Sequence, residues 1–124
     1  MDVAELISVC WLDVKGKKSL DKFAFGTEYC ISFVVKRTPE AQNLCNIKLE
    51  LKFNGGWPSK ERVVQDLNKI LPANKWATLK VADFKNFVGG NDTEMTISLT
   101  NHEDVWKSGL KIAGILIHPK PRVN

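Results

Sequence analysis

Large aromatic side chains occur in segments of the sequence that are otherwise polar and turn-forming. Phe25 precedes a glycine in FAFGT, Trp57 lies in NGGWPS, and Trp106 lies in DVWKSG. Trp76 opens the apolar stretch WATLKV, on the side opposite to its inward-facing residues. Such rings are costly to expose unless something covers them. Because a flat aromatic ring stacks well on a sugar ring or a nucleic-acid base, these four residues predict a binding surface.

Polar side chains beside these rings are suited to bind the edges of a ligand. Lys107 directly follows Trp106, and we expect it to hydrogen-bond at the margin of the surface. Further groups that can bind hydroxyl or acetamido groups are present at Asn74, Asn101, Glu103 and Asp104. The alternative is that a loop tryptophan folds back as a lid on the core. The residues predicted to contact the ligand, a carbohydrate or a nucleic-acid base, are Phe25, Trp57, Trp76, Trp106 and Lys107.

The sequence contains no recognisable catalytic motif. It has no zinc-protease helix motif, nucleophile elbow or dinucleotide fingerprint. GKKS at residues 16–19 lacks the upstream glycine of a phosphate-binding loop. His102 and His118 lie in different segments, without a metal-ligand pattern around them. We therefore expect a binding module that is not an enzyme and has no cofactor or metal.

Alternation of apolar and polar residues predicts the elements that position these loops. NIKLELKF is the clearest case, with Ile47, Leu49, Leu51 and Phe53 on one side. The same alternation indicates strands in SVCWLDV, YCISFVV, WATLKV and EMTISLT, and a last strand, GLKIAGILIHP, with a bulge or a close backbone approach at Gly114. At least six antiparallel strands with one apolar face each imply two packed sheets. The predicted fold is all-β: a jelly-roll-like β-sandwich forming one domain over residues 1–124.

One stretch, SKERVVQDLNKIL, departs from this period. It predicts a short helix between a capping Ser59 and Pro72. Its apolar residues at helical spacing are Val63, Val64, Leu67, Ile70 and Leu71.

The order of the predicted strands also predicts which loops lie at the same end of the sandwich. If they alternate in direction, one end of the sandwich carries residues 16–27, 55–75 and 101–109. The other end carries residues 38–45 and 84–92. This arrangement brings the aromatic residues together at one end.

Composition limits the remaining possibilities. The chain has 124 residues, 44% of them hydrophobic, which is enough for one domain with a core. No apolar run is long enough to span a membrane, and the N-terminus does not resemble a signal peptide, so we expect a cytoplasmic protein without membrane insertion.

The net charge of +4 is scattered, apart from a small cluster at Lys15, Lys17, Lys18 and Lys22. We interpret Cys10, Cys30 and Cys45 as small apolar residues, with an intermolecular disulfide as the alternative.

Several of these motifs occur together in a known family. CWLDVKGK, TEYCISFVVK, KWATLKVADF, EMTISL and WKSGLKIAGILIHPKP follow one another in the order seen in the phloem protein two lectins. The chain resembles this plant family, which includes the Nictaba-related lectins, over nearly its whole length. The family often has proline where Phe25 stands and arginine where His118 stands, and residues 55–75 follow no family pattern.

The resemblance implies a function that composition and periodicity do not give. It implies a non-catalytic lectin for N-acetylglucosamine oligomers (chitooligosaccharides) and related N-glycan motifs, which forms a homodimer. It also implies a location in phloem companion cells and sieve-element sap and a role in plant defence. Family members are also described as RNA-binding, so an RNA-binding protein that uses the same aromatics and the lysine cluster is the alternative. A structural filament subunit, cross-linked through cysteine, is a third.

Overall fold

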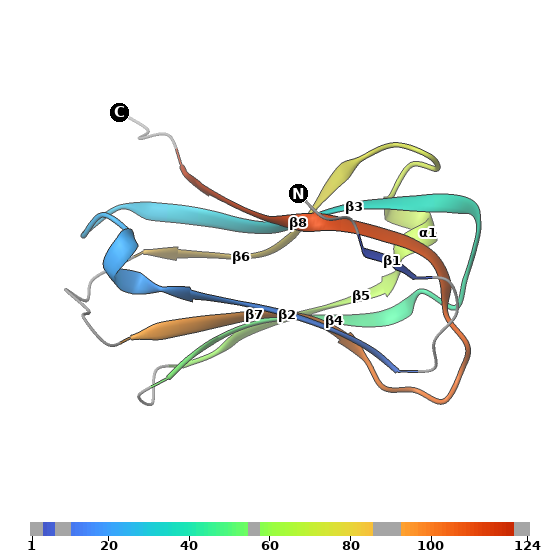
Figure 1. Cartoon of the computed structure of the whole chain (residues 1–124), viewed down its shortest axis with the longest axis horizontal. Helices are drawn as coiled ribbons and strands as arrows, with labels where there is room; N and C mark the ends of the chain where they lie inside the picture. The colour runs from blue at the N-terminus through green and yellow to red at the C-terminus, as the bar shows by residue number, and fades with distance from the viewer. Residues whose placement is uncertain (1–3, 7–10, 55–57, 86–92, 121–124) are drawn as a thin grey trace.

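Two four-stranded antiparallel sheets face each other and form the molecule (Figure 1). The structure, a computed structural model, describes residues 4–6, 11–54, 58–85 and 93–120. Hydrogen-bonded neighbours follow the order β1-β8-β3-β6 in one sheet and β2-β7-β4-β5 in the other. The strands are β1 (Ala4–Leu6), β2 (Leu12–Ser19), β3 (Glu28–Gln42), β4 (Cys45–Phe53), β5 (Lys60–Asp66), β6 (Ala77–Lys85), β7 (Glu94–Asn101) and β8 (Ser108–Pro119). A 3₁₀ turn, η1 (Leu20–Lys22), and a short helix, α1 (Leu67–Ile70), join them.

This strand order is that of a jelly roll, so the predicted all-β sandwich is confirmed. The alternating residues of the strands meet between the sheets as expected. Ile47, Leu49 and Leu51 on β4 are completely buried, as are Ile31 and Phe33 on β3. Their neighbours in sequence point outward, because successive side chains of a strand face opposite sides.

A register shift marks the expected bulge at Gly114. Val34 on β3 pairs with Gly114, whereas Val35 pairs with Ile112, so β8 carries an extra residue there. The bulge prediction is therefore confirmed.

The predicted helix over residues 59–71 is wrong for most of its length. Residues 60–66 form β5, which pairs antiparallel with β4, and only Leu67–Ile70 are helical. The helix begins at Asp66, whose carboxylate accepts a hydrogen bond from the Asn68 backbone N–H, and not at Ser59. Strand pairing explains the burial, since Val64 is buried while its neighbour Val63 is exposed.

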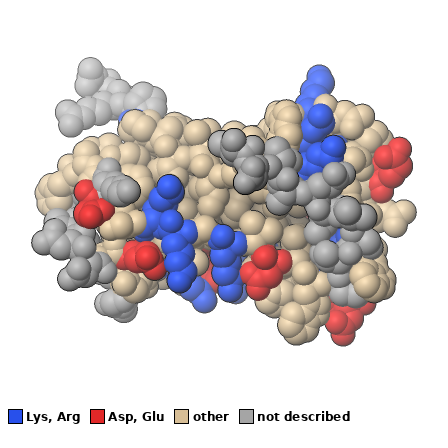
Figure 2. Space-filling view, in the orientation of Figure 1, with Lys and Arg blue, Asp and Glu red and all other residues tan. Residues whose placement is uncertain are grey.

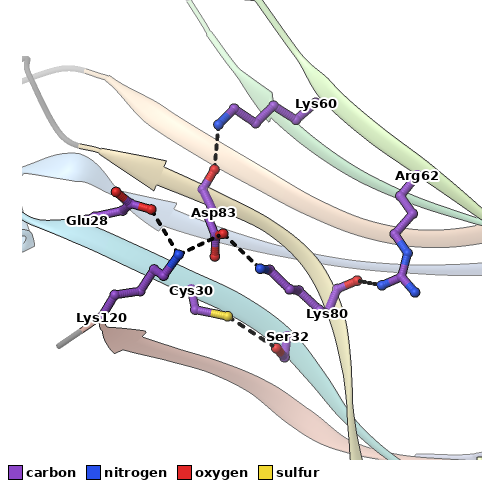
Figure 3. A network of polar contacts seen from close by, with 8 residues as sticks. All are labelled: Glu28, Cys30, Ser32, Lys60, Arg62, Lys80, Asp83 and Lys120. Atoms are coloured by element: carbon purple, nitrogen blue, oxygen red, sulfur yellow. Dashed lines mark hydrogen bonds and ion pairs between the residues drawn. The ribbon is translucent and has the colours of Figure 1, made fainter. Parts of the chain in front are cut away.

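Side chains from β5 close the edge of β6 in the opposite sheet (Figure 3). Lys60 Nζ donates to the Asp83 carbonyl at 2.5 Å, and Arg62 donates to the Lys80 carbonyl at 2.7 Å. The Asp83 carboxylate lies between the ammonium groups of Lys80 and Lys120. The hydrogen bond from Lys80 holds the pKa of Asp83 below its ordinary value, although partial burial acts in the other direction. These contacts occupy backbone groups that an unprotected edge strand would present to another chain.

Two further observations concern the cysteines and the helices. Cys30 and Cys45 are free thiols, and Cys10 lies outside the described residues. Within the described ranges, no helix reaches the length and apolarity that crossing a membrane requires.

Candidate functional site

The connections of the sandwich divide between its ends differently from the prediction. The segment between β7 and β8 lies beside the β3–β4 turn, because Asn43 Nδ2 donates to the Trp106 carbonyl at 2.6 Å. Figure 1 shows this segment, in orange, at the same end as α1 and opposite η1. We call this end of the sandwich, which carries the β7–β8 segment and the β3–β4 turn, the Trp106 end. At the other end, the Leu20 N–H donates to the Thr93 carbonyl.

The missed strand explains this error. A helix in place of β5 reverses the predicted direction of every later strand, so the prediction puts the connections after it at the wrong ends. Phe25 follows η1 and is 68% exposed, at the end opposite Trp106. The prediction that these two rings share one surface is therefore wrong. Trp57 lies outside the described residues, and its part in binding stays a prediction.

Trp76 lies on a different face. Its ring is 46% exposed, and Lys36 Nζ lies 5.7 Å from the ring centroid. Lys36 follows the buried Val35 on β3, so it points to the outer face of the β1-β8-β3-β6 sheet. Trp76 is therefore associated with this outer face through a cation–π contact.

Trp106 and Trp11 present the most exposed indole rings at the Trp106 end, with 63% and 62% of their surfaces exposed. Trp11 stacks on His102, with ring centroids 4.9 Å apart, and its Nε1 donates to Asp104 at 3.1 Å. The His102 Nε2 lies 3.3 Å from the Asp13 carboxylate. One face of Trp11 is thus covered and its orientation is fixed. We name Trp11, His102 and Trp106 the aromatic end.

The sequence prediction missed Trp11. The alternation in SVCWLDV places Trp11 on the side of the strand opposite Leu12 and Val14. A large aromatic residue on the outward side of an amphipathic strand was the signal that pointed to it.

Hydrogen bonds within residues 101–107 hold the segment that carries Trp106. The Lys107 side chain is completely buried, and its Nζ donates to the carbonyls of Glu103 and Val105 at 2.7 and 2.9 Å. The Asn101 side chain is also buried, and its Oδ1 accepts from the Glu103 N–H. The expected place of Lys107 at the margin of a surface is wrong, because its ammonium group points into the segment. Lys107 instead shapes the backbone on either side of Trp106.

The charged side chains on the outer face of the β2-β7-β4-β5 sheet are paired. Lys48 lies 3.2 Å from Glu61, and Lys52 lies 3.4 Å from Glu50. The hydrogen bond from Lys48 to Glu61 raises the pKa of this lysine. Figure 2 likewise shows basic and acidic side chains interleaved over the visible face, rather than one continuous basic surface. Such a surface does not favour a polyanion over a neutral ligand.

Comparison with known proteins agrees with the motifs. Residues 1–119 match the family model described as Phloem protein 2. The chain is 32% identical over 127 residues to "Protein PHLOEM PROTEIN 2-LIKE A1" from Arabidopsis thaliana, covering 97% of this chain and 49% of that protein. It is 31% identical over 122 residues to a protein named "Lectin" from Luffa acutangula, covering 97% of this chain and 56% of that protein.

A third relative carries a different name. "Putative F-box protein PP2-B12" from Arabidopsis thaliana is 27% identical over 128 residues, covering 96% of this chain and 49% of that protein. The chain therefore spans about half the length of these three relatives. Together with the match over residues 1–119 and the sandwich fold, these similarities establish that the chain belongs to the phloem protein 2 family.

Proposed function

We propose that the chain is a carbohydrate-binding domain of the lectin type and that it binds its ligand at the aromatic end. The observation that carries this proposal is the pair of exposed indoles, Trp11 and Trp106, beside a segment whose backbone is fixed by internal hydrogen bonds. The Trp11 ring is held in one orientation and Trp106 is carried on a fixed backbone, so stacking on a sugar would cost little conformational freedom. The name of the Luffa relative supports the same function.

The proposed ligands are N-acetylglucosamine oligomers and related N-glycan motifs, as the family resemblance implies. His102 and Asp104 lie beside the Trp11 ring, so hydrogen-bonding groups are close to the stacking face. A sugar with hydroxyl and acetamido groups would use both kinds of contact. Binding, and not catalysis, is the proposed role.

The proposal extends to the assembly and the setting of the domain. A shallow site of this kind binds one sugar chain weakly, and two copies joined as a homodimer would gain avidity on a surface that carries many glycans. The family and its phloem-named relatives favour phloem as the tissue in which the domain acts and defence as its role there.

Salt dependence separates this proposal from RNA binding. Calorimetric titrations with the N-acetylglucosamine tetramer should give affinities that differ by less than about twofold between about 50 and about 500 mM NaCl, because no counterions are released. A single-stranded RNA of matched length serves as the comparison. If the RNA binds more tightly than the tetramer at low salt and loses affinity steeply as salt rises, the domain is an RNA-binding protein and the carbohydrate proposal fails.

A further inference from the structure

A groove of about 600 Å³ runs over the outer face of the β2-β7-β4-β5 sheet and reaches the aromatic end at His102. Its floor carries three hydroxyl side chains of the central strand β7, Thr96, Ser98 and Thr100. These residues alternate with the core residues Met95, Ile97 and Leu99 of the same strand, so all three point to the outer face of the sheet, where the walls leave Ser98 only 5% exposed. The groove exists because β7 bears short side chains where its neighbours bear long ones.

The strand register builds the walls of the groove. Ser98 lies directly opposite Lys15 on β2 and Glu50 on β4, and Thr96 and Thr100 likewise have a charged residue on either side. The three register rows of the sheet are Asp13–Thr100–Lys48, Lys15–Ser98–Glu50 and Lys17–Thr96–Lys52, and all their members except Asp13 and Lys17 line the groove. Residues two apart on a strand are about 7 Å apart, so the hydroxyls recur at this interval along the floor.

The charges of the walls compensate one another. Lys15 lies 3.7 Å from Asp13, and Glu50 lies 3.8 Å from Lys48 and 3.4 Å from Lys52. A charged ligand would have to break pairs that already exist. The hydroxyl groups on the floor both donate and accept hydrogen bonds, which suits the hydroxyl and amide groups of an uncharged ligand.

The groove leads to the aromatic end. His102 and Glu103 line it, and His102 stacks on Trp11. The floor from Thr96 to His102 spans six residue steps of an extended chain, about 20 Å, which is longer than a single sugar unit.

We propose that this groove is an extended subsite, in which successive units of an uncharged, linear glycan lie along β7 after the unit that stacks at the aromatic end. The inference rests on the proposed function and adds where the chain of the glycan runs. It assigns the floor to Thr96, Ser98 and Thr100 and predicts a preference for oligomers over the monomer.

Filling the far end of the groove tests the proposal. Thr96→Phe should leave the affinity for the N-acetylglucosamine monomer unchanged, because the aromatic end is untouched. It should weaken binding of the tetramer by at least about tenfold, the effect expected when a few hydrogen bonds are lost. Thr78→Phe makes the same change at an exposed position of β6, in the opposite sheet. It should alter neither the affinity for the monomer nor that for the tetramer.

Ser98→Leu provides a second variant in the middle of the floor, and circular dichroism of each variant establishes that it is folded. If folded Thr96→Phe and Ser98→Leu both bind the tetramer as tightly as the wild type, the groove is not a subsite, although the carbohydrate function stands. If the wild type binds neither monomer nor tetramer, the proposed function itself fails, and the groove inference fails with it.

Discussion

Replacing Gly109 with alanine is expected to lower the free energy of unfolding by about 2–5 kcal/mol. Gly109 has φ +86°, a conformation that side chains with a Cβ rarely adopt. A Cβ built there would lie 2.6 Å from the Ala41 Cα and 2.6 Å from the Thr38 Oγ1 on β3. Because the contact with Ala41 involves backbone, a change of side-chain rotamer cannot relieve it. Gly109 thus allows β8 to begin close to β3, directly after the segment that carries Trp106.

Urea denaturation measures this effect, and Gly26→Ala is the matched control. Gly26 also has positive φ, +75°, but a Cβ there would meet no atom within 4 Å. Gly26→Ala should therefore lower the free energy of unfolding only by the backbone strain, about 1–2 kcal/mol. Equal losses for the two variants would show that close packing at Gly109 contributes nothing beyond its backbone conformation.

Trp106→Ala is expected to weaken binding of the N-acetylglucosamine tetramer about five- to a hundredfold, the effect of losing one stacked ring worth about 1–3 kcal/mol. Its stability should change by less than about 0.5 kcal/mol, because the ring is already largely exposed. Titrations of the variant together with thermal melts measure both quantities. A buried lid would behave in the opposite way, with a large loss of stability and normal binding by the folded fraction.

Trp76→Ala is the control for this variant, since it also removes an exposed indole but from the outer face of the other sheet. Its affinity for the tetramer should match that of the wild type. If both variants bind the tetramer equally weakly, Trp76 belongs to the binding surface. This result would contradict the assignment of the binding site to the aromatic end.

Six of the strands were predictable from the sequence because each presents one apolar face to the core, whereas β1 and β5 were not predicted. Ile47, Leu49 and Leu51 show this pattern without ambiguity. Residues 59–71 do not, because their apolar positions fit both a helix and a strand followed by a turn. Pairing with β4 makes residues 60–66 a strand and not a helix. Such pairing joins residues that are separated in the sequence, so local periodicity does not reveal it.

The candidate site was less predictable than the fold, because it depends on which ends the connections occupy. Trp106 was correctly expected to be exposed. Lys107 was not expected to be buried, since a lysine is buried only where carbonyls converge on its ammonium group. The partnership of Trp11 with His102 required the β2–β7 register, which brings residues 12 and 101 opposite each other.

The central claim is that glycan binds at the aromatic end of the sandwich, and a nuclear magnetic resonance titration with the N-acetylglucosamine tetramer tests it most directly. We predict that the indole Nε1–H signals of Trp11 and Trp106 shift on binding, together with the backbone amides of His102 and Glu103. The Trp76 indole signal and the Phe25 amide should stay unchanged. Shifts centred on Trp76 or Phe25, with Trp11 and Trp106 unaffected, would contradict the claim and place the site on another face of the domain.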